Sequence, residues 1–364
     1  MRNSGAFKMT DILFTPARLG AVQIANRVVM APMTRNRAGN EDVPTETMVE
    51  YYRQRSGAGL IVTEGTQPSR EGKGYWRTPG IHSPAQVAGW RKVTDAVHAE
   101  GGKIAVQLMH CGRAVVPANR EYDADIIAPS AIPLDGGVPG PDGKPLPTGQ
   151  PREMDLGDME RVTFEYADAA RNASMAGFDA VELHCASGYL INQFLNPGSN
   201  RRTDEYGGDG EARARFPAQI VDALADAIGA DRVGIRISPG NPYNGMDPSD
   251  PAETFVPFLK AIADLPLAYV HVVDLGLDDL DALAMVRDHF AGAIIANNML
   301  EAESGAALID AGRADAVSFG RHWIGNPDLV ERLRAGAALT RADRTGYYSG
   351  EERGYTDYPT MDAT

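Results

Sequence analysis

Residues 180–190 read AVELHCASGYL, and this stretch guides the interpretation of the whole chain. The apolar residues up to Leu183 predict a buried strand, and the polar run that starts at His184 predicts a loop at its end. A titratable pair, His184 and Tyr189, therefore follows the strand. Taken alone, a hydrogen-bonded core histidine beside a packing tyrosine would be the more common explanation. The rest of the chain has to decide between packing and chemistry.

A short buried strand followed by an amphipathic helix recurs eight times. We expect strands at Arg27–Met30, Gly59–Thr63, Lys103–Leu108, Ala180–Leu183, Val233–Ile237, Ala268–Val273, Ala293–Ala296 and Ala316–Phe319. We expect helices at Thr45–Arg55, Pro84–Glu100, Gly157–Ala176, Glu211–Ile228, Pro251–Ala263, Leu280–His289, Ala302–Ala311 and Pro327–Ala335. Eight repeats favour an α/β fold of the (β/α)8 TIM-barrel type over a doubly wound sheet.

The barrel is expected to be a single domain over residues 1–364, with an N-terminal cap and with residues 1–10 flexible. The longest insertion, residues 114–151, follows the third strand and is rich in proline and glycine, which predicts a loop or hairpin lid. The tail at residues 345–359 carries four tyrosines and is expected to pack on the barrel.

Composition excludes several classes of function. The chain has 364 residues, 43% of them apolar, and a formal net charge of -14. This charge disfavours nucleic acid and anionic membranes as partners. We expect neither a membrane span nor a secretory signal. With only Cys111 and Cys185, reduced thiols and a cytoplasmic location are expected.

In a barrel of this type the active site lies where the strands end, and several polar side chains meet there. They are Thr34, Gln107, His184, Tyr189, Arg236 and Arg321. Beside Arg321, the loops at Asn297–Met299 and Gly320–Arg321, followed by a helix from Asn326–Pro327, match the place where such barrels bind phosphate. An anionic cofactor is the natural ligand; an exposed arginine paired with acidic residues is the alternative.

Two other chemistries are disfavoured. His110–Cys111 and His184–Cys185 offer soft metal ligands, but adjacent residues on an extended segment point to opposite sides, so we expect no metal. A serine hydrolase would need a G-x-S-x-G turn, which the chain lacks, and Ser187 lies on the same loop as His184.

With these motifs in place, the chain resembles the Old Yellow Enzyme family of FMN-dependent ene-reductases, of the N-ethylmaleimide reductase and pentaerythritol tetranitrate reductase type. The resemblance rests on ordered motifs over nearly the whole chain. They include Ala31-Pro32-Met33-Thr34-Arg35, Thr63-Glu64-Gly65-Thr66, Gly72-Lys73-Gly74-Tyr75, the stretch at 181–195, Arg202-Thr203-Asp204-Glu205-Tyr206-Gly207-Gly208, Phe319-Gly320-Arg321 and Gly354-Tyr355-Thr356-Asp357-Tyr358-Pro359.

The resemblance implies a non-covalent FMN reduced by NADPH or NADH. The cofactor-binding residues it implies are Pro32, Met33, Thr34, Gly65, Gln107, Arg236, Asn297, Asn298, Met299, Gly320 and Arg321. Arg236 would stabilise the negative charge that appears on reduction. Activated alkenes, namely unsaturated carbonyl, maleimide or nitro compounds, would then be reduced in a ping-pong scheme.

The family also implies roles for the opening stretch. His184 would donate a hydrogen bond to the substrate oxygen, with Ser187 as a second donor, and Tyr189 would protonate the alkene. Tyr75, Met109 and Tyr348 would line the substrate pocket.

Three positions depart from the family pattern. Ser187 replaces an asparagine or histidine, Met109 replaces a frequent tryptophan, and Asn297–Asn298 replaces a glycine-containing pair. A non-catalytic flavin-binding barrel is the first alternative. A sugar-phosphate aldolase or isomerase is the second, although it would need a lysine or a carboxylate pair at the strand ends. The oligomer is expected to be a monomer or a homodimer.

Overall fold

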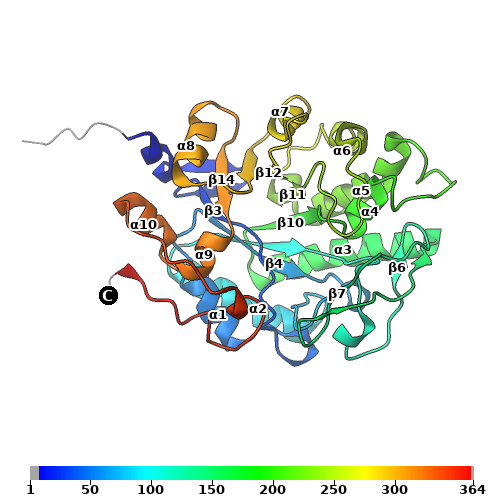
Figure 1. Cartoon of the computed structure of the whole chain (residues 1–364), viewed down its shortest axis with the longest axis horizontal. Helices are drawn as coiled ribbons and strands as arrows, with labels where there is room; N and C mark the ends of the chain where they lie inside the picture. The colour runs from blue at the N-terminus through cyan, green and yellow to red at the C-terminus, as the bar shows by residue number, and fades with distance from the viewer. Residues whose placement is uncertain (1–7, 362–364) are drawn as a thin grey trace, which may run out of the picture.

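A closed barrel of eight parallel strands forms the centre of the computed structural model, which describes residues 8–361 (Figure 1). In order around the barrel, the strands are β3 (Val28–Met30), β4 (Leu60–Thr66), β5 (Ile104–Leu108), β10 (Ala180–Cys185), β11 (Val233–Ile237), β12 (Tyr269–Val273), β13 (Ile294–Asn297) and β14 (Ala316–Phe319). The last strand pairs with the first. The predicted (β/α)8 barrel is confirmed, and each predicted strand overlaps an observed one.

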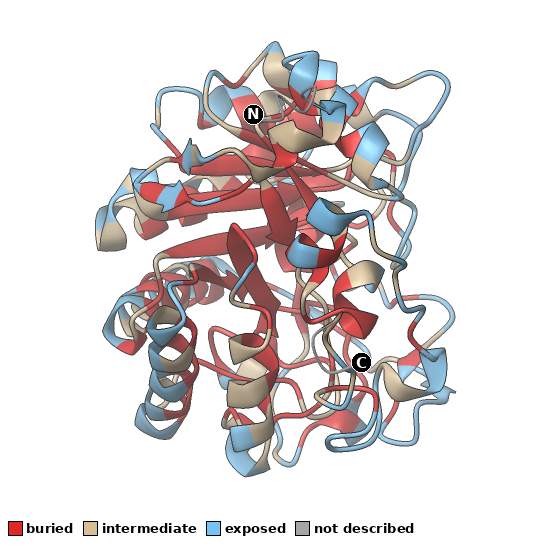
Figure 2. Cartoon of the chain, turned by 90° about the vertical axis from the view of Figure 1, so that its left-hand side faces the viewer, coloured by how far each residue is buried: buried red, intermediate tan, exposed pale blue. Residues whose placement is uncertain are grey.

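Helices surround the barrel and have exposed residues on their outer sides, whereas the barrel strands are buried (Figure 2). The α-helices are α1 (Glu46–Arg53), α2 (Pro84–Ala99), α3 (Leu156–Ala176), α4 (Leu190–Leu195), α5 (Gly210–Ile228), α6 (Pro251–Ala261), α7 (Ala282–Arg287), α8 (Ala302–Asp310), α9 (Arg321–Gly325) and α10 (Leu329–Ala335). The 3-10 helices are η1 (Met9–Phe14), η2 (Asn40–Asp42), η3 (Arg70–Gly72), η4 (Pro117–Asn119), η5 (Ala230–Arg232) and η6 (Arg344–Gly346). None of the helices in the described residues is both long enough and apolar enough to cross a membrane.

The chain after the last strand differs from the expectation. A helix was expected to begin at Asn326–Pro327, but α9 already begins at Arg321, directly after β14, and α10 begins only at Leu329. Asn326 has a non-helical backbone with φ -136°, and its side-chain amide donates to the carbonyl of His322 at 2.8 Å. A residue before proline disfavours the helical conformation, so the chain breaks there into two helices.

An antiparallel hairpin closes the bottom of the barrel. It consists of β1 (Ala17–Leu19) and β2 (Val22–Ile24), and its apolar side chains pack on the lowest layer of the barrel interior. At the hairpin turn, Gly20 has φ 57°, and a Cβ there would lie 2.2 Å from the carbonyl oxygen of Asp231. Glycine is needed at this position because any side chain would collide with the barrel. The hairpin is the predicted N-terminal cap.

The insertion after β5 contains short strands and forms one wall of the barrel mouth. Here β7 (Val138–Pro139) pairs with β8 (Pro145–Leu146) as a hairpin, and β6 (Ile127–Ala128) pairs with β9 (Arg152–Glu153). Val115, Leu134 and Val138 from this segment form a small core with Met109 and Tyr189. The predicted hairpin insertion therefore contacts residues of the predicted site.

The C-terminal segment lies across buried arginine side chains. Arg37 is fully buried and donates to backbone carbonyls of the tail, at 2.8 Å to Tyr347 and 2.9 Å to Gly346. Arg35 donates to the carbonyls of Tyr347 and Gly354. Residues 1–10 were expected to be flexible; residues 1–7 lie outside the described residues, and Met9 and Thr10 belong to η1.

Candidate active site

A layer of hydrogen-bonded polar side chains replaces apolar packing in the upper half of the barrel. Gln107 on β5 donates to Glu182 Oε1 on β10 at 2.8 Å. His271 on β12 contacts Glu182 Oε2 through Nδ1 at 2.8 Å and the Ser318 hydroxyl through Nε2 at 2.7 Å. Four strands thereby contribute to one network at the carboxyl ends of the sheet.

Arg236 completes this layer from β11. Its guanidinium lies 2.9 Å from His271 Nδ1 and donates to Asn297 Oδ1 at 2.7 Å. Asn297 in turn donates to the carbonyl of Ser318 at 3.1 Å. Arg236 is 9% exposed. The nearly buried guanidinium of Arg236 is thus held in one orientation beneath the mouth of the barrel.

The charges of this layer balance each other. Burial raises the pKa of Glu182, but His271 and Arg236 more than offset it, so that the pKa of Glu182 ends below its usual value. Burial, with Arg236 beside it, lowers the pKa of His271 to about 4. At neutral pH the layer therefore contains one carboxylate, one guanidinium and a neutral imidazole.

His184 stands one residue before the end of β10 and acts as a neutral donor. Burial, and next Arg236, lower its pKa to about 3. The backbone N–H of Ala186 donates to its Nδ1 at 3.2 Å. Since a neutral imidazole carries one proton, that proton must be on Nε2. His184 is therefore set up to donate one hydrogen bond from Nε2.

Tyr189 lies beside this histidine, immediately before α4. The two rings meet edge to face with centroids 4.8 Å apart. Burial raises the pKa of Tyr189 well above its usual value, so the phenol stays protonated. The Tyr75 hydroxyl lies 2.9 Å from the Tyr189 hydroxyl. The sequence-predicted pair, His184 and Tyr189, is thus adjacent in space.

The loop between the two donors has a constrained backbone. Ser187 has φ 54°, in the left-handed region that few non-glycine residues adopt. Its N–H donates to the Ser238 hydroxyl at 2.9 Å, and its carbonyl accepts from Asn244 at 2.9 Å. These bonds from the loop after β11 fix the position of Ser187 relative to His184.

Met109 and Gly65 fill the neighbouring part of the mouth. A Cβ at Gly65 would lie 2.4 Å from the terminal carbon of Met109. Met109 is 4% exposed and packs with Tyr189 and Tyr75. The predicted pocket residue Tyr348 lies at the rim and is 61% exposed. Pro32, Met33 and Thr34 follow β3 and are half-buried.

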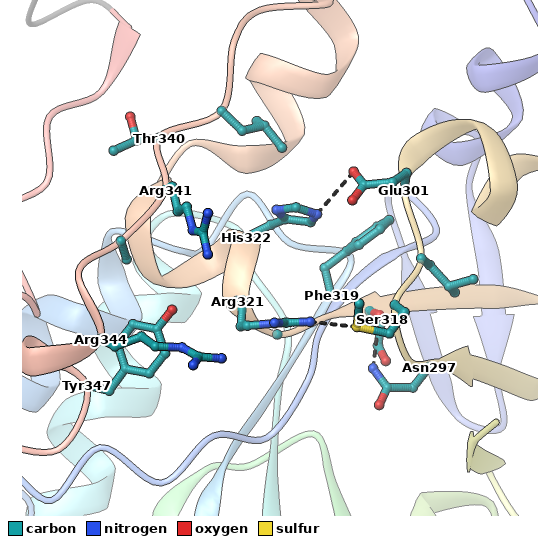
Figure 3. Close-up of a pocket in the computed structure, with 15 residues that line it drawn as sticks. Asn297, Glu301, Ser318, Phe319, Arg321, His322, Thr340, Arg341, Arg344 and Tyr347 are labelled. Carbon is teal, nitrogen blue, oxygen red and sulfur yellow. Dashed lines mark hydrogen bonds and ion pairs between the residues drawn. The ribbon is translucent and has the colours of Figure 1, made fainter. Parts of the chain in front are cut away.

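A pocket of about 380 Å³ opens at the other end of the mouth, next to β13 and β14 (Figure 3). Arg321, His322, Arg341 and Arg344 line it. Its acidic lining residue, Glu301, pairs with His322 at 3.2 Å. The excess of cations suits a phosphate group.

The loop beside this pocket adopts unusual backbone angles. Asn298 has φ 109° and Met299 has φ 51°, and Met299 is 74% exposed. The side chain of Arg321 contacts the Met299 sulfur at 2.6 Å. Gly320 separates β14 from α9, which brings the first turn of α9 to the pocket. The predicted residues Asn298, Met299, Gly320 and Arg321 are thus gathered at one edge.

Three residues of the polar layer were missed in the sequence: Glu182, His271 and Ser318. A signal was present for Glu182, because it stands two residues before His184 and side chains alternate along a strand. His271 is a histidine inside an apolar strand, which should have indicated an inward polar group. Among the described residues, no group of three or more histidine, cysteine, aspartate or glutamate side chains could hold a metal ion.

Comparison with known proteins agrees in family and in fold. Residues 12–340 match the NADH:flavin oxidoreductase / NADH oxidase family. A probable flavin mononucleotide-dependent alkene reductase of Leishmania infantum is 42% identical over 364 residues, covering 98% of this chain and all of the relative. A putative 12-oxophytodienoate reductase of Oryza sativa subsp. japonica is 38% identical over 361 residues, covering 96% of this chain and 93% of the relative.

Solved structures of similar sequence superpose over most of the barrel. Morphinone reductase in complex with tetrahydroNAD has a TM-score of 0.91 at 42% identity, covering 96% of this chain and 98% of that one. An old yellow enzyme homologue from Zymomonas mobilis has a TM-score of 0.91 at 40% identity, covering 95% of this chain and 99% of that one.

Proposed function

Because this chain belongs to the NADH:flavin oxidoreductase / NADH oxidase family, within it the Old Yellow Enzyme family, we propose that residues 1–364 form one FMN-binding domain that reduces activated alkenes. The enzyme is an FMN-dependent oxidoreductase that takes its electrons from NADPH or NADH. Its substrates are electron-poor C=C bonds conjugated to a carbonyl, imide or nitro group.

The observation that carries this proposal is a hydrogen-bond donor, His184, adjacent to a proton donor, Tyr189, near a fixed cation. His184 is neutral with its proton on Nε2, and Tyr189 is a buried phenol in edge contact with it. One donor can hydrogen-bond an oxygen while the other protonates carbon. Reduction of an activated alkene needs both operations on one substrate.

The residues of the mouth fit FMN. Arg236 offers a guanidinium held by His271 and Asn297, where it would stabilise negative charge on the pyrimidine ring. Gln107 would bind the same ring edge, with Pro32, Met33, Thr34 and Gly65 around it. FMN, when bound, supplies the carrier that passes a hydride from the nicotinamide to the alkene.

The basic pocket suits the phosphate of FMN. Arg321 lines it, and the backbone of Asn297, Asn298, Met299 and Gly320 borders it. The neighbouring start of α9 offers free N–H groups, which favour an anion. We propose that this edge of the mouth anchors the cofactor while Arg236 and Gln107 orient its ring.

Each donor then has a defined task. His184 Nε2 donates to the substrate oxygen and withdraws charge as the hydride arrives at the β-carbon. Tyr189 passes its phenolic proton to the α-carbon from the other face. Ser187 offers a shorter second donor to the oxygen, and Tyr75, Met109 and Tyr348 border the substrate.

Neither alternative has support in the polar layer. An aldolase or isomerase would need a lysine or a carboxylate pair, and the layer contains no lysine and one carboxylate, Glu182. A passive flavin carrier would not need a hydrogen-bond donor and a proton donor side by side. Both cysteines among the described residues are free and buried, which is compatible with the cytoplasmic location that we propose. We propose a monomer or homodimer.

Two measurements test the function. The purified protein should bind FMN and absorb near ~450 nm, the flavin's own band. After anaerobic reduction with NADPH or NADH, 2-cyclohexenone or N-ethylmaleimide should reoxidise the flavin rapidly. A protein that binds no FMN, or whose flavin neither compound reoxidises, would contradict the proposal.

The role of Tyr189 has its own test. Tyr189→Phe keeps the ring and removes the proton, so alkene reduction should fall by roughly 100-fold or more, the usual contribution of a positioned proton donor. Reduction of the flavin by nicotinamide should change little. Stopped-flow measurement of the two half-reactions separates these effects, and equal damage to both would assign Tyr189 to binding instead.

A further inference from the structure

Three tyrosine side chains lead from the buried proton donor to the protein surface. Tyr189 is 9% exposed, Tyr75 is half-buried and Tyr243 is 52% exposed. They come from three separate segments: the loop before α4, the loop between β4 and α2, and the loop between β11 and α6. Exposure thus rises stepwise from the reaction site to solvent.

A hydroxyl contact joins Tyr189 to Tyr75, and Tyr243 lies near Tyr75 on the solvent side. The hydroxyls of Tyr189 and Tyr75 lie 2.9 Å apart, and either one can donate. Their rings meet edge to face at 6.1 Å, which fixes the pair in this geometry. Tyr243 lies close enough to Tyr75 that, after burial, it contributes to raising the pKa of the Tyr75 phenol. Among the three, Tyr75 is therefore the link.

The loop that carries Tyr243 is held against the backbone of the donor loop. Asn244 donates to the carbonyl of Ser187 at 2.9 Å, and the N–H of Tyr243 donates to Asn241 at 3.0 Å. At Gly188, which has φ 72°, a Cβ would lie 2.7 Å from the carbonyl oxygen of Tyr243. Glycine at 188 lets the two loops approach this closely.

The proposed reaction leaves Tyr189 in need of a new proton. When its O–H bond breaks, the proton forms a C–H bond at the substrate's α-carbon, and the electron pair stays on the phenol oxygen. The resulting phenolate is buried, which is unfavourable for a charged group. Each catalytic cycle must therefore return one proton from solvent to Tyr189.

We propose that Tyr75 and Tyr243 form the route by which solvent protons return to Tyr189 during turnover. This inference rests on the proposed function, because it assumes that Tyr189 protonates the substrate. Tyr75 gives its proton to the Tyr189 oxygen, Tyr243 gives its proton to Tyr75, and hydronium or a buffer acid gives one to Tyr243. No electrons move along this path, since the two electrons of the reduction come from NADPH or NADH.

Tyr243→Phe is the decisive variant, because it removes one exposed hydroxyl and keeps the ring. Turnover of 2-cyclohexenone should fall by about tenfold, less than the loss of the donor itself, since water still reaches the phenolate slowly. Flavin reduction by nicotinamide should be unchanged. A single reoxidation of pre-reduced enzyme should also be unchanged, because Tyr189 starts that event with its proton.

Two further readouts separate proton return from a structural role. Raising the concentration of a small acid such as imidazolium should restore turnover in Tyr243→Phe and leave the wild type unaffected. The solvent deuterium isotope effect on kcat should grow in the variant. Tyr75→Phe and the double variant should have the same turnover defect as each other, because both hydroxyls serve one path.

Tyr206→Phe is the matched control, since the Tyr206 hydroxyl accepts only from Gln219 at 3.4 Å and lies outside this path. It should behave as wild type. Wild-type turnover in Tyr243→Phe, or slower flavin reduction and single reoxidation without rescue by acid, would overturn the inference. A wild-type enzyme that does not reduce alkenes would instead contradict the proposed function, so the two failures are distinct.

Discussion

Ser187 is one of the positions expected to depart from the family pattern, and its backbone makes a specific exchange possible. The left-handed φ of 54° is unfavourable for most side chains, and asparagine tolerates it better than serine does. The main-chain bonds to Ser238 and Asn244 do not depend on the side chain. An asparagine should therefore fit here without moving the loop.

Ser187→Asn should tighten binding of a phenolic ligand such as p-hydroxybenzaldehyde by about tenfold, the gain of roughly one charge-assisted hydrogen bond to the phenolate. The added amide places a second donor beside His184. The charge-transfer absorbance of the ligand with FMN measures the affinity, and Ser187→Ala serves as the control without a donor. Equal affinity in all three proteins would mean that position 187 does not reach the ligand.

At the residue scale, the sequence predicted which residues lie at the mouth of the barrel but not which hydrogen bonds their side chains make. The positions at or just after the ends of expected strands indicated His184, Tyr189, Gln107 and Arg236. The tautomer of His184 depends on the Ala186 N–H, which only backbone geometry reveals. Contacts across the barrel, such as Glu182 with His271, join residues 89 positions apart and leave no local pattern.

At the scale of elements, the buried guanidinium of Arg37, together with that of Arg35, holds the C-terminal tail. Arg37 donates to the carbonyls of Tyr347, Gly346, Ser349 and Arg353, and a carboxylate partner is absent from these contacts. The rigid, planar guanidinium of arginine can donate to several carbonyls at once, whereas a lysine has its three donors on one nitrogen. The tail in turn places Tyr347 beside the basic pocket.

Arg37→Lys should therefore loosen residues 344–356 while the barrel stays folded. Two or more tail bonds would be lost, at roughly 1 kcal/mol each. Hydrogen–deuterium exchange should rise in the tail peptides and stay unchanged in β10 and β11. Lys92→Arg, at an exposed ion pair with Glu46, is the matched control; tail exchange equal to wild type in Arg37→Lys would contradict the anchoring role.

Long amphipathic helices were predictable from their periodicity, whereas the short helices α4 and α9 were not. The pattern located α3 and α5 because 21 and 19 residues give several turns of periodicity. By contrast, α4 has 6 residues and α9 has 5, and neither begins with a side-chain cap. These two helices border the donor loop and the basic pocket, where tertiary packing decides the local structure.

For the whole molecule, the barrel divides into a lower apolar layer and an upper polar one. Val29, Val62 and Ile295 pack below on the hairpin β1–β2, while Glu182, Arg236 and His271 bond above. Apolar burial stabilises the lower half. The upper half is less stabilised by apolar burial, because it holds charged groups and hydrogen-bond donors in fixed positions. The folded enzyme therefore holds several buried titratable groups in their neutral forms.

This arrangement predicts acid sensitivity. Burial lowers the pKa of His110 and His184 to about 3 and that of His271 to about 4. In the unfolded chain histidine titrates near ~6.5. Below that pH the histidines of the unfolded chain bind protons, whereas the buried histidines of the folded chain stay neutral. Stability therefore falls as pH drops from ~6.5 to ~4. Each group contributes roughly 1.4 kcal/mol per pH unit.

Glu64 acts in the opposite direction and reduces the net dependence of stability on pH. Burial raises its pKa to about 7, so the unfolded chain ionises this carboxyl first and Glu64 adds stability as pH falls from ~7 to ~4.5. Three histidines outweigh one carboxyl, and the urea midpoint should decrease steadily from pH 6.5 to 4.5.

His110→Asn keeps an acceptor for the Gly112 N–H, which His110 binds at 3.1 Å, and removes one titrating group. It should flatten the decrease; a midpoint independent of pH, or the same slope in this variant, would mean that the buried histidines are not neutral in the folded enzyme.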